Sequence, residues 1–81
     1  MNIDTLAKFL NEANKATYAN KSAPKVAPSR LMSEDYHFEK DGLIYHDTYF
    51  GGRDFIGEEI VYETEKPMWG ANYFGFVLVE K

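Results

Sequence analysis

The chain has 81 residues, no cysteine and a formal net charge of −4, which excludes disulfide bonds and thiolate zinc sites. Its first residues lack the basic and apolar stretches of a signal peptide, and no apolar run approaches the roughly 20 residues of a transmembrane helix. We therefore expect one cytoplasmic domain over residues 1–81, with no membrane partner.

Charge is unevenly distributed along this chain. Residues 1–33 carry five basic and two acidic side chains, a net charge of +3, whereas residues 34–81 carry four basic and eleven acidic ones, a net charge of −7. Binding to a phosphate backbone draws on Lys and Arg, so the acidic part argues against a nucleic-acid partner.

The first predicted element is an amphipathic helix over residues 4–18, which Asn2 or Asp4 can cap. Apolar side chains recur there at helical spacing: Leu6, Phe9, Leu10, Ala13 and either Ala16 or Thr17. Residues 19–33 follow as a long connection without periodicity. Because connections of this length are usually functional or mobile, we expect residues 19–32 to be the least ordered internal segment.

From residue 35 the pattern changes to a period of two, which is typical of β-strands. Asp41-Gly42 is a strong signal for a two-residue hairpin between strands at about 35–40 and 43–50. The resulting register places Phe38 opposite Tyr45. One face of the hairpin then carries the predicted core side chains Tyr36, Phe38, Leu43, Tyr45 and Tyr49.

The same register places His37 opposite His46 on the other face. Two imidazoles in such a pair have Cβ atoms about 4.5–5.5 Å apart, so they could share a metal ion or act as a pH switch. Their position beside Glu39, on the face away from the aromatic core, favours an exposed cross-strand pair instead. We therefore expect no metal ion and no cofactor.

Two further strands are predicted at about 55–63 and 68–79. Gly57 indicates a bulge or a close backbone approach in the first of them. The second is apolar on both faces from Tyr73 to Val79, whereas an antiparallel strand with one wet face alternates apolar and polar residues. We therefore expect a second copy of the chain to cover this strand, which makes the protein a homodimer. The fold class is α+β: one N-terminal helix packed on an antiparallel meander of about four strands.

Acidic residues among aromatic ones mark the candidate site. Asp47 lies on the core face, where an ionised carboxylate needs a partner, and at least one of Glu58 and Glu59 should point inward after Gly57. The pattern fits either a satisfied buried polar network or carboxylates in an aromatic ligand pocket. That pocket would use Tyr45, Asp47, Tyr49, Glu58, Trp69, Asn72 and Tyr73.

Three blocks carry a family resemblance: Y-x-D-x-Y at 45–49, F-x-G-E-E at 55–59 and P-x-W-x-x-N-Y at 67–73. With them the chain resembles a bacterial family known as domain of unknown function 5680, from the first helix to about Gly75. The resemblance implies no established activity. Some members of that family follow a helix-turn-helix DNA-binding domain, as a sensor or dimerisation module would.

Standard phosphate-loop, dinucleotide, zinc-protease and nucleophile-elbow motifs are absent from the sequence. The favoured function is therefore a small-ligand- or partner-binding module with a regulatory role. Two alternatives stay open. One is a small hydrolase-like enzyme that uses Asp47 with Glu58 or Glu59, and the other is a structural dimerisation domain without a pocket.

Overall fold

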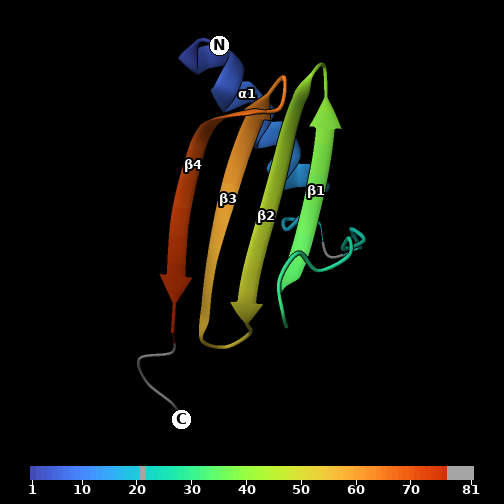
Figure 1. Cartoon of the computed structure of the whole chain (residues 1–81), viewed down its shortest axis with the longest axis vertical. Helices are drawn as coiled ribbons and strands as arrows, with labels where there is room; N and C mark the ends of the chain where they lie inside the picture. Colours follow the sequence, from blue (N-terminus) through green and yellow to red (C-terminus); the bar gives the residue numbers. More distant parts are fainter. Residues whose placement is uncertain (21, 77–81) are drawn as a thin grey trace.

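The computed structural model describes residues 1–20 and 22–76, and it confirms the α+β fold. The helix α1 (Ile3–Ala16) precedes the strands β1 (Glu34–Lys40), β2 (Leu43–Gly51), β3 (Phe55–Glu63) and β4 (Lys66–Gly75). The strands form one antiparallel sheet in the order β1-β2-β3-β4, and α1 lies across one of its faces (Figure 1). No helix among the described residues has the length and apolar content that crossing a membrane requires.

Local hydrogen bonds explain both ends of α1. Asn2 is the N-cap, and its Oδ1 accepts a hydrogen bond from the backbone N–H of Thr5 at 2.8 Å. The helix ends at Ala16, two residues before the predicted end, because Thr17 leaves helical dihedral angles. Thr17 turns inward rather than Ala16: it is buried, and its hydroxyl donates to the carbonyl of Ala13 at 2.8 Å.

The core lies between α1 and the half of the sheet that ends in the β1–β2 hairpin. Its buried side chains are Phe9, Ala13, Leu43, Tyr45 and Val61, with Leu6, Leu10, Phe38 and Trp69 packed around them. Burial of one large apolar side chain contributes about 1.5–3 kcal/mol, so this small cluster supplies much of the stability. The other half of this sheet face, away from the β1–β2 hairpin, does not belong to this core cluster.

The predicted hairpin is confirmed residue by residue. Phe38 faces Tyr45 and His37 faces His46 in the β1–β2 register. Asp41 and Gly42 have φ angles of 53° and 80°, the left-handed values that a two-residue hairpin turn requires.

The turn between β3 and β4 is tighter than predicted. It consists of Thr64 and Glu65, whose φ angles of 51° and 66° are unfavourable for threonine and glutamate. Pro67 lies just outside the strand predicted at about 68–79, but it belongs to β4, because an edge strand tolerates a residue without an N–H on its open side. β4 ends at Gly75. Residues 77–79, on which the predicted dimer strand partly relies, lie outside the described residues.

Of the two possibilities predicted for Gly57, a bulge or a close backbone approach, the structure shows the close approach. The register shift in this pair of strands falls between Val61 and Tyr62. A Cβ atom at Gly57 would lie 2.3 Å from Cζ of Tyr73 on the neighbouring strand. Alternation therefore continues unbroken through residues 57–59, so that Glu59 shares the face of Gly57 and Glu58 points to the opposite face.

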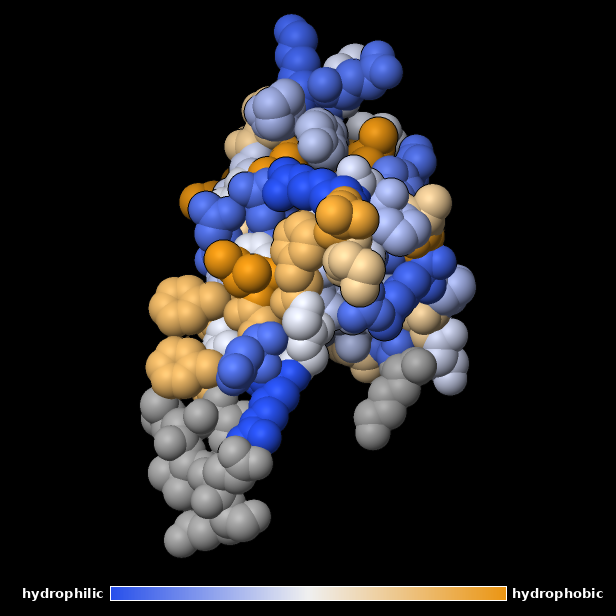
Figure 2. All heavy atoms as spheres, turned by 60° about the horizontal axis from the view of Figure 1, so that its bottom comes forward, coloured by the Kyte–Doolittle hydropathy of each residue, from blue (hydrophilic) through white to orange (hydrophobic). Residues whose placement is uncertain are grey.

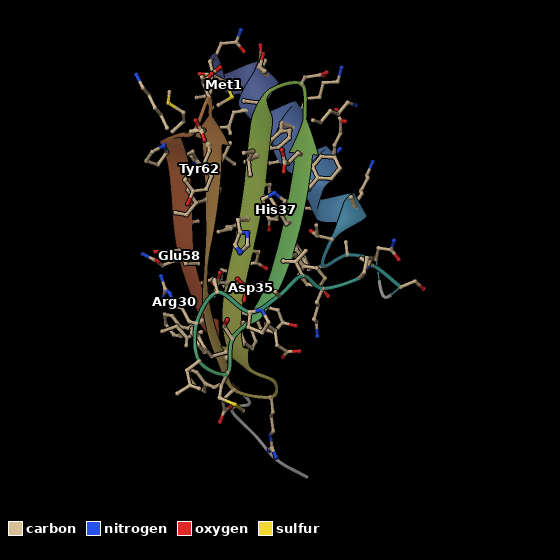
Figure 3. The ribbon with its side chains drawn as sticks, turned by 45° about the vertical axis from the view of Figure 1, so that its right-hand side comes forward. Met1, Arg30, Asp35, His37, Glu58 and Tyr62 are labelled. Carbon is tan, nitrogen blue, oxygen red and sulfur yellow. The ribbon has the colours of Figure 1, made fainter. Side chains whose placement is uncertain are left out.

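The connection over residues 19–33 runs to the sheet face opposite α1. Within it Val26 forms an isolated antiparallel bridge with Asp35, and Figure 3 shows the connection passing beside the ends of the strands, with Arg30 near Glu58. The lower order that we predict for this segment stays a prediction. Its last residues are nevertheless held by side-chain hydrogen bonds to the sheet, described below.

Candidate functional site

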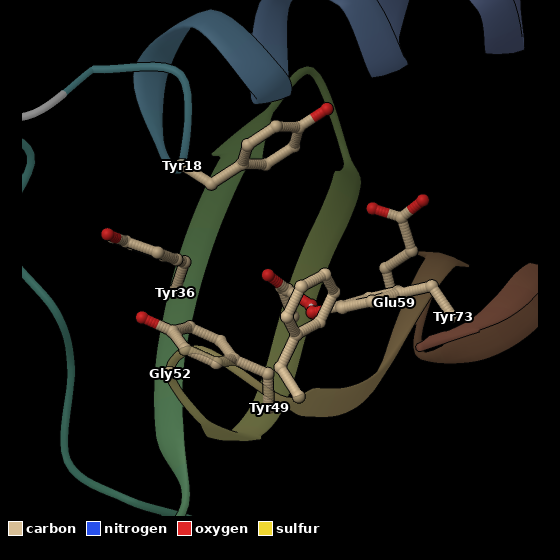
Figure 4. A pocket seen from close by; sticks show the side chains of 8 residues that line it. Tyr18, Tyr36, Tyr49, Gly52, Glu59 and Tyr73 are labelled. Carbon is tan, nitrogen blue, oxygen red and sulfur yellow. The ribbon is translucent and has the colours of Figure 1, made fainter. Parts of the chain in front are cut away.

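A cavity of about 520 Å³ opens on the α1 side of the sheet, where the helix ends. Its lining residues come from the turn after α1, from all four strands and from the β2–β3 turn (Figure 4): Tyr18, Tyr36, Asp47, Tyr49, Gly52, Phe55, Glu59 and Tyr73. Five of these eight are aromatic, two are acidic and none is basic. The described lining is thus mainly aromatic, with two carboxylates.

Strand register explains why these side chains meet. Asp47 is the cross-strand partner of Glu59, and Tyr49 is the partner of Gly57, which in turn faces Tyr73. Because Gly57 has no side chain, the ring of Tyr73 can lie over it. This position lets the Tyr73 hydroxyl donate a hydrogen bond to Oδ1 of Asp47.

The rings form two walls around the carboxylates. Tyr36 and Tyr49 stack with their centroids 6.3 Å apart, and Phe55 and Tyr73 lie 6.2 Å apart at an angle of 54°. Tyr18 stands above them as a half-exposed fifth ring (Figure 4). Offset and tilted pairs at these distances are favourable for aromatic rings, so the walls support one another.

Both carboxylates are held by tyrosine hydroxyls. Asp47 is only 3% exposed, and burial raises its pKa; the hydrogen bond from Tyr73 opposes this effect and the nearby charge of Glu59 adds to it. Glu59 accepts a hydrogen bond at 2.7 Å from the hydroxyl of Tyr45. Burial, followed by these hydrogen bonds, raises the pKa of Tyr45 and of Tyr73, so both remain proton donors.

Lys25 is a cationic side chain that already contacts one of these aromatic rings. The Nζ atom of Lys25 lies 5.7 Å from the centroid of the Tyr49 ring and pairs with Glu34. The hydrogen bond that Lys25 donates to Glu34, followed by the contact with Tyr49, raises the pKa of Lys25. Lys25 is not among the residues that line the cavity. A cationic group is thus already compatible with a face of this ring.

The structure brings together only part of the predicted site. Asp47, Tyr49 and Tyr73 line the cavity, and Tyr45 is fully buried beneath it. Trp69 packs instead against the core cluster. Glu58 and Asn72 instead face each other across β3 and β4 on the opposite side of the sheet, because no bulge at Gly57 reverses the alternation.

Sequence reasoning missed several lining residues. Tyr36 and Glu59 were considered, the first as core and the second as an alternative to Glu58. If Gly57 is taken as a close backbone approach and not as a bulge, the alternation continues and Glu59 is the glutamate that points inward. Tyr18, Gly52 and Phe55 carried no such signal, because their contribution depends on how the end of the helix and the β2–β3 turn pack.

A second polar cluster lies on the opposite face and centres on Asp35, which is completely buried. Its carboxylate receives hydrogen bonds from the N–H and Oγ of Ser29, from Ser33 Oγ, from Thr48 Oγ1 and from His46 Nε2, over 2.6–3.2 Å. Burial alone would raise the pKa of Asp35, but the hydrogen bonds outweigh it and lower the pKa. Asp35 thereby ties the end of the connecting loop to the sheet.

The histidine pair extends this cluster. The Nδ1 atoms of His37 and His46 lie 3.0 Å apart, with the rings at 67° to each other. The Nε2 atom of His37 lies 2.8 Å from Oε2 of Glu39. Among the described residues no group of three or more His, Asp or Glu side chains is arranged around a common metal position.

Residues 47–81 match the family model described as "Domain of unknown function (DUF5680)". This segment of the chain is therefore similar to DUF5680. No curated protein and no solved structure matches the sequence. The DUF5680 match confirms the resemblance in the part of the chain that supplies most of the cavity, including Asp47, Glu59 and Tyr73. It gives no activity, so the function must be argued from the geometry.

Proposed function

We propose that this chain is a binding module for a small organic cation, such as a quaternary or primary ammonium compound. The observation that carries the proposal is the cavity lining, where two carboxylates lie among five aromatic rings and no lysine or arginine is among the described lining residues. Its volume of about 520 Å³ falls within the usual range of small-molecule sites.

Both parts of the lining favour positive charge. A cation within about 6 Å of an aromatic centroid gains about 0.5–2 kcal/mol, and aromatic cages recognise quaternary ammonium groups in this way. The buried carboxylate of Asp47 adds a Coulombic attraction, which is stronger in a partly desolvated site than in water. A bound cation would also offset the mutual repulsion of Asp47 and Glu59, which share the cavity.

The raised pKa of Asp47 favours a second candidate function. A small hydrolase-like enzyme needs a carboxyl group that keeps its proton near neutral pH, and burial shifts Asp47 in that direction. The partner would be Glu59, because Glu58 lies on the other face. The two functions differ in the response to a cation: a binding module loses the Asp47 proton when the cation binds, whereas an acid catalyst needs that proton during turnover.

A cytoplasmic, regulatory and homodimeric role in a bacterium is part of the same proposal. Ile56 and its cross-strand partner Phe74 are 61% and 74% exposed, and Phe76 is 58% exposed. Figure 2 shows apolar side chains gathered at this end of the molecule. This exposure supports self-association there, which sedimentation at tens of micromolar tests. The cavity supports ligand binding over a purely structural dimerisation role.

A charge-matched pair of ligands tests the proposal directly. Choline and its uncharged isostere 3,3-dimethylbutan-1-ol have nearly the same shape, so a cation site should bind choline at least about tenfold more tightly, a difference of about 1.4 kcal/mol. Ligand-observed NMR and calorimetric titration measure both affinities. Equal binding of the two compounds, or binding of neither choline nor tetramethylammonium nor a primary amine, would contradict the proposal.

Two neighbouring glutamates provide a matched pair of variants. Glu59→Gln removes a charge from the cavity and should weaken choline binding by about tenfold or more. Glu58→Gln removes the same charge from the next residue, on the opposite face, and should leave binding within about twofold of the wild type. Equal effects of the two substitutions would show that overall acidity, rather than the cavity, attracts the cation.

A further inference from the structure

Four polar side chains on the face opposite the cavity form a continuous row: Glu39, His37, His46 and Asp35. The contacts along this row measure 2.8, 3.0 and 2.6 Å. Figure 3 shows Asp35 and His37 projecting from the same side of β1. The row has no role in cation binding at the cavity, so it calls for a separate explanation.

The positions of the protons make the contact between the two histidines, at the centre of the row, unusual. A carboxylate only accepts hydrogen bonds, so the Nε2 atoms that face Glu39 and Asp35 must both carry protons. In two neutral imidazoles the Nδ1 atoms are then both unprotonated. Their lone pairs meet at 3.0 Å, and this contact is repulsive unless a proton or a metal ion lies between them.

The surroundings of the two imidazoles match those of metal-bound histidine. Such histidines almost always donate the other ring N–H to a carboxylate or carbonyl, which fixes the tautomer and the orientation of the ring. Here the carboxylates are Asp35, itself fixed by Ser29, Ser33 and Thr48, and Glu39. Their two negative charges also balance the charge of a divalent ion.

The distance between the two Nδ1 atoms indicates which type of metal ion would fit. With metal–nitrogen bonds of about 2.0–2.1 Å, a separation of 3.0 Å corresponds to an N–metal–N angle of roughly 95°. This angle suits two adjacent positions of a square-planar or octahedral ion, the geometry of Cu²⁺ and Ni²⁺. A tetrahedral ion such as Zn²⁺ needs a separation of about 3.3–3.4 Å at the same bond length.

We propose that His37 and His46 chelate one divalent transition-metal ion, Cu²⁺ or Ni²⁺ in preference to Zn²⁺, through their facing Nδ1 atoms. Water or a bound ligand completes the coordination from the adjacent groove of about 510 Å³, which Ser29, Thr48, Glu58 and Tyr62 help to line. The ion clamps β1 to β2 and, through Asp35, holds the connecting loop against the sheet. This inference is independent of the cation site on the other face.

Copper titration of protein without a histidine tag tests the site. We expect one tight Cu²⁺ equivalent per chain by calorimetry and an electron paramagnetic resonance spectrum with hyperfine coupling from two imidazole nitrogens. Ni²⁺ should bind more tightly than Zn²⁺, and a saturating metal concentration should raise the melting temperature, because the folded chain presents the chelate and the unfolded chain does not.

Variants separate the chelate from adventitious copper binding. His37→Ala removes an exposed ligand without disturbing the buried bonds of Asp35, and it should lower Cu²⁺ affinity at least tenfold and remove one nitrogen from the spectrum. Glu39→Gln keeps both ligands and should lower affinity about tenfold, the lower end of the usual effect of such partners. Glu65→Gln in the same groove should change nothing. Unchanged affinity in His37→Ala, or a spectrum without two imidazoles, would overturn the proposal.

Discussion

The two faces of the sheet treat a buried aspartate in opposite ways. Asp35, on the loop side, receives five hydrogen bonds from four residues, and its pKa is lowered. Asp47, on the helix side, receives a hydrogen bond from Tyr73 and lies near the charge of Glu59, and its pKa is raised. Both side chains are almost completely shielded from water, at 0% and 3% exposed, and the two aspartates differ in the number of hydrogen-bond donors around the carboxyl group.

This comparison separates a structural carboxylate from one that is available for function. Asp35 has its hydrogen-bonding capacity largely filled by the protein, so it can hold the fold together but offers little to a ligand. Asp47 keeps unmet negative charge beside a cavity. Buried groups that the fold itself does not stabilise are typical of functional sites, which is why the cavity, rather than the Asp35 cluster, is the better candidate for ligand binding.

The largest effect should come from replacing each aspartate by its neutral isostere. Asp35→Asn places an NH2 group against hydroxyl and imidazole donors, and we expect it to lower the free energy of unfolding by about 3 kcal/mol. Asp47→Asn still accepts the hydrogen bond from Tyr73 and no longer buries a charge, so stability should stay the same or rise. Urea unfolding of both variants measures the difference, and equal losses would refute the distinction between the faces.

The dependence of stability on pH sharpens the same contrast. The pKa of Asp35 is lower in the folded chain than the unfolded value of about 3.9, so its stabilising contribution is complete above that value and is lost as pH falls. The pKa of Asp47 is raised, so its contribution is largest below about 3.9 and is lost as pH rises through the folded pKa.

Urea midpoints between pH 3 and 7 test these opposite signs. Asp35→Asn should remove much of the acid-side loss of stability, whereas Asp47→Asn should flatten the decline that accompanies rising pH. If Asp47→Asn instead steepened that decline, the pKa of Asp47 would be lowered rather than raised, and the charge argument for the cavity would fail.

The sequence was sufficient to predict the faces of the first hairpin but not both clusters. The Asp41-Gly42 turn fixes the register, so Asp47 and the facing histidines followed from counting. The partners of Asp35 could not be predicted this way, because Ser29 and Ser33 lie in a loop without periodicity. The choice between Glu58 and Glu59 depended on whether Gly57 is a bulge or a contact, and that is decided by Tyr73 on another strand.

Substitution of Gly57 should reduce stability by an intermediate amount and should affect only the helix side of the sheet. In Gly57→Ala the new Cβ would lie 2.3 Å from the Tyr73 ring, so the ring must move and its bond to Asp47 is broken. We expect a loss of about 1–3 kcal/mol in the free energy of unfolding and weaker choline binding, with Cu²⁺ binding on the other face unchanged.

Gly52 provides the control for this substitution. It also lines the cavity, but a Cβ atom there would meet nothing within 4 Å. Gly52→Ala should therefore leave stability within about 0.5 kcal/mol of the wild type, as is usual for an open surface position. Equal losses in the two variants would show that backbone flexibility, rather than the Tyr73 ring, explains the need for glycine at Gly57.

The smallest expected effect lies in the β3–β4 turn, at the edge of the sheet. Thr64 and Glu65 adopt the left-handed φ values that Asn-Gly adopts readily, so Thr64→Asn with Glu65→Gly should raise the free energy of unfolding by about 1 kcal/mol. Thermal and urea unfolding measure the gain. Affinities for choline and Cu²⁺ should not change, because the turn contacts neither Asp47 nor the histidine pair. A stability gain that altered either affinity would mean that the two faces are coupled through the sheet, so that the two aspartates could no longer be treated as independent sites.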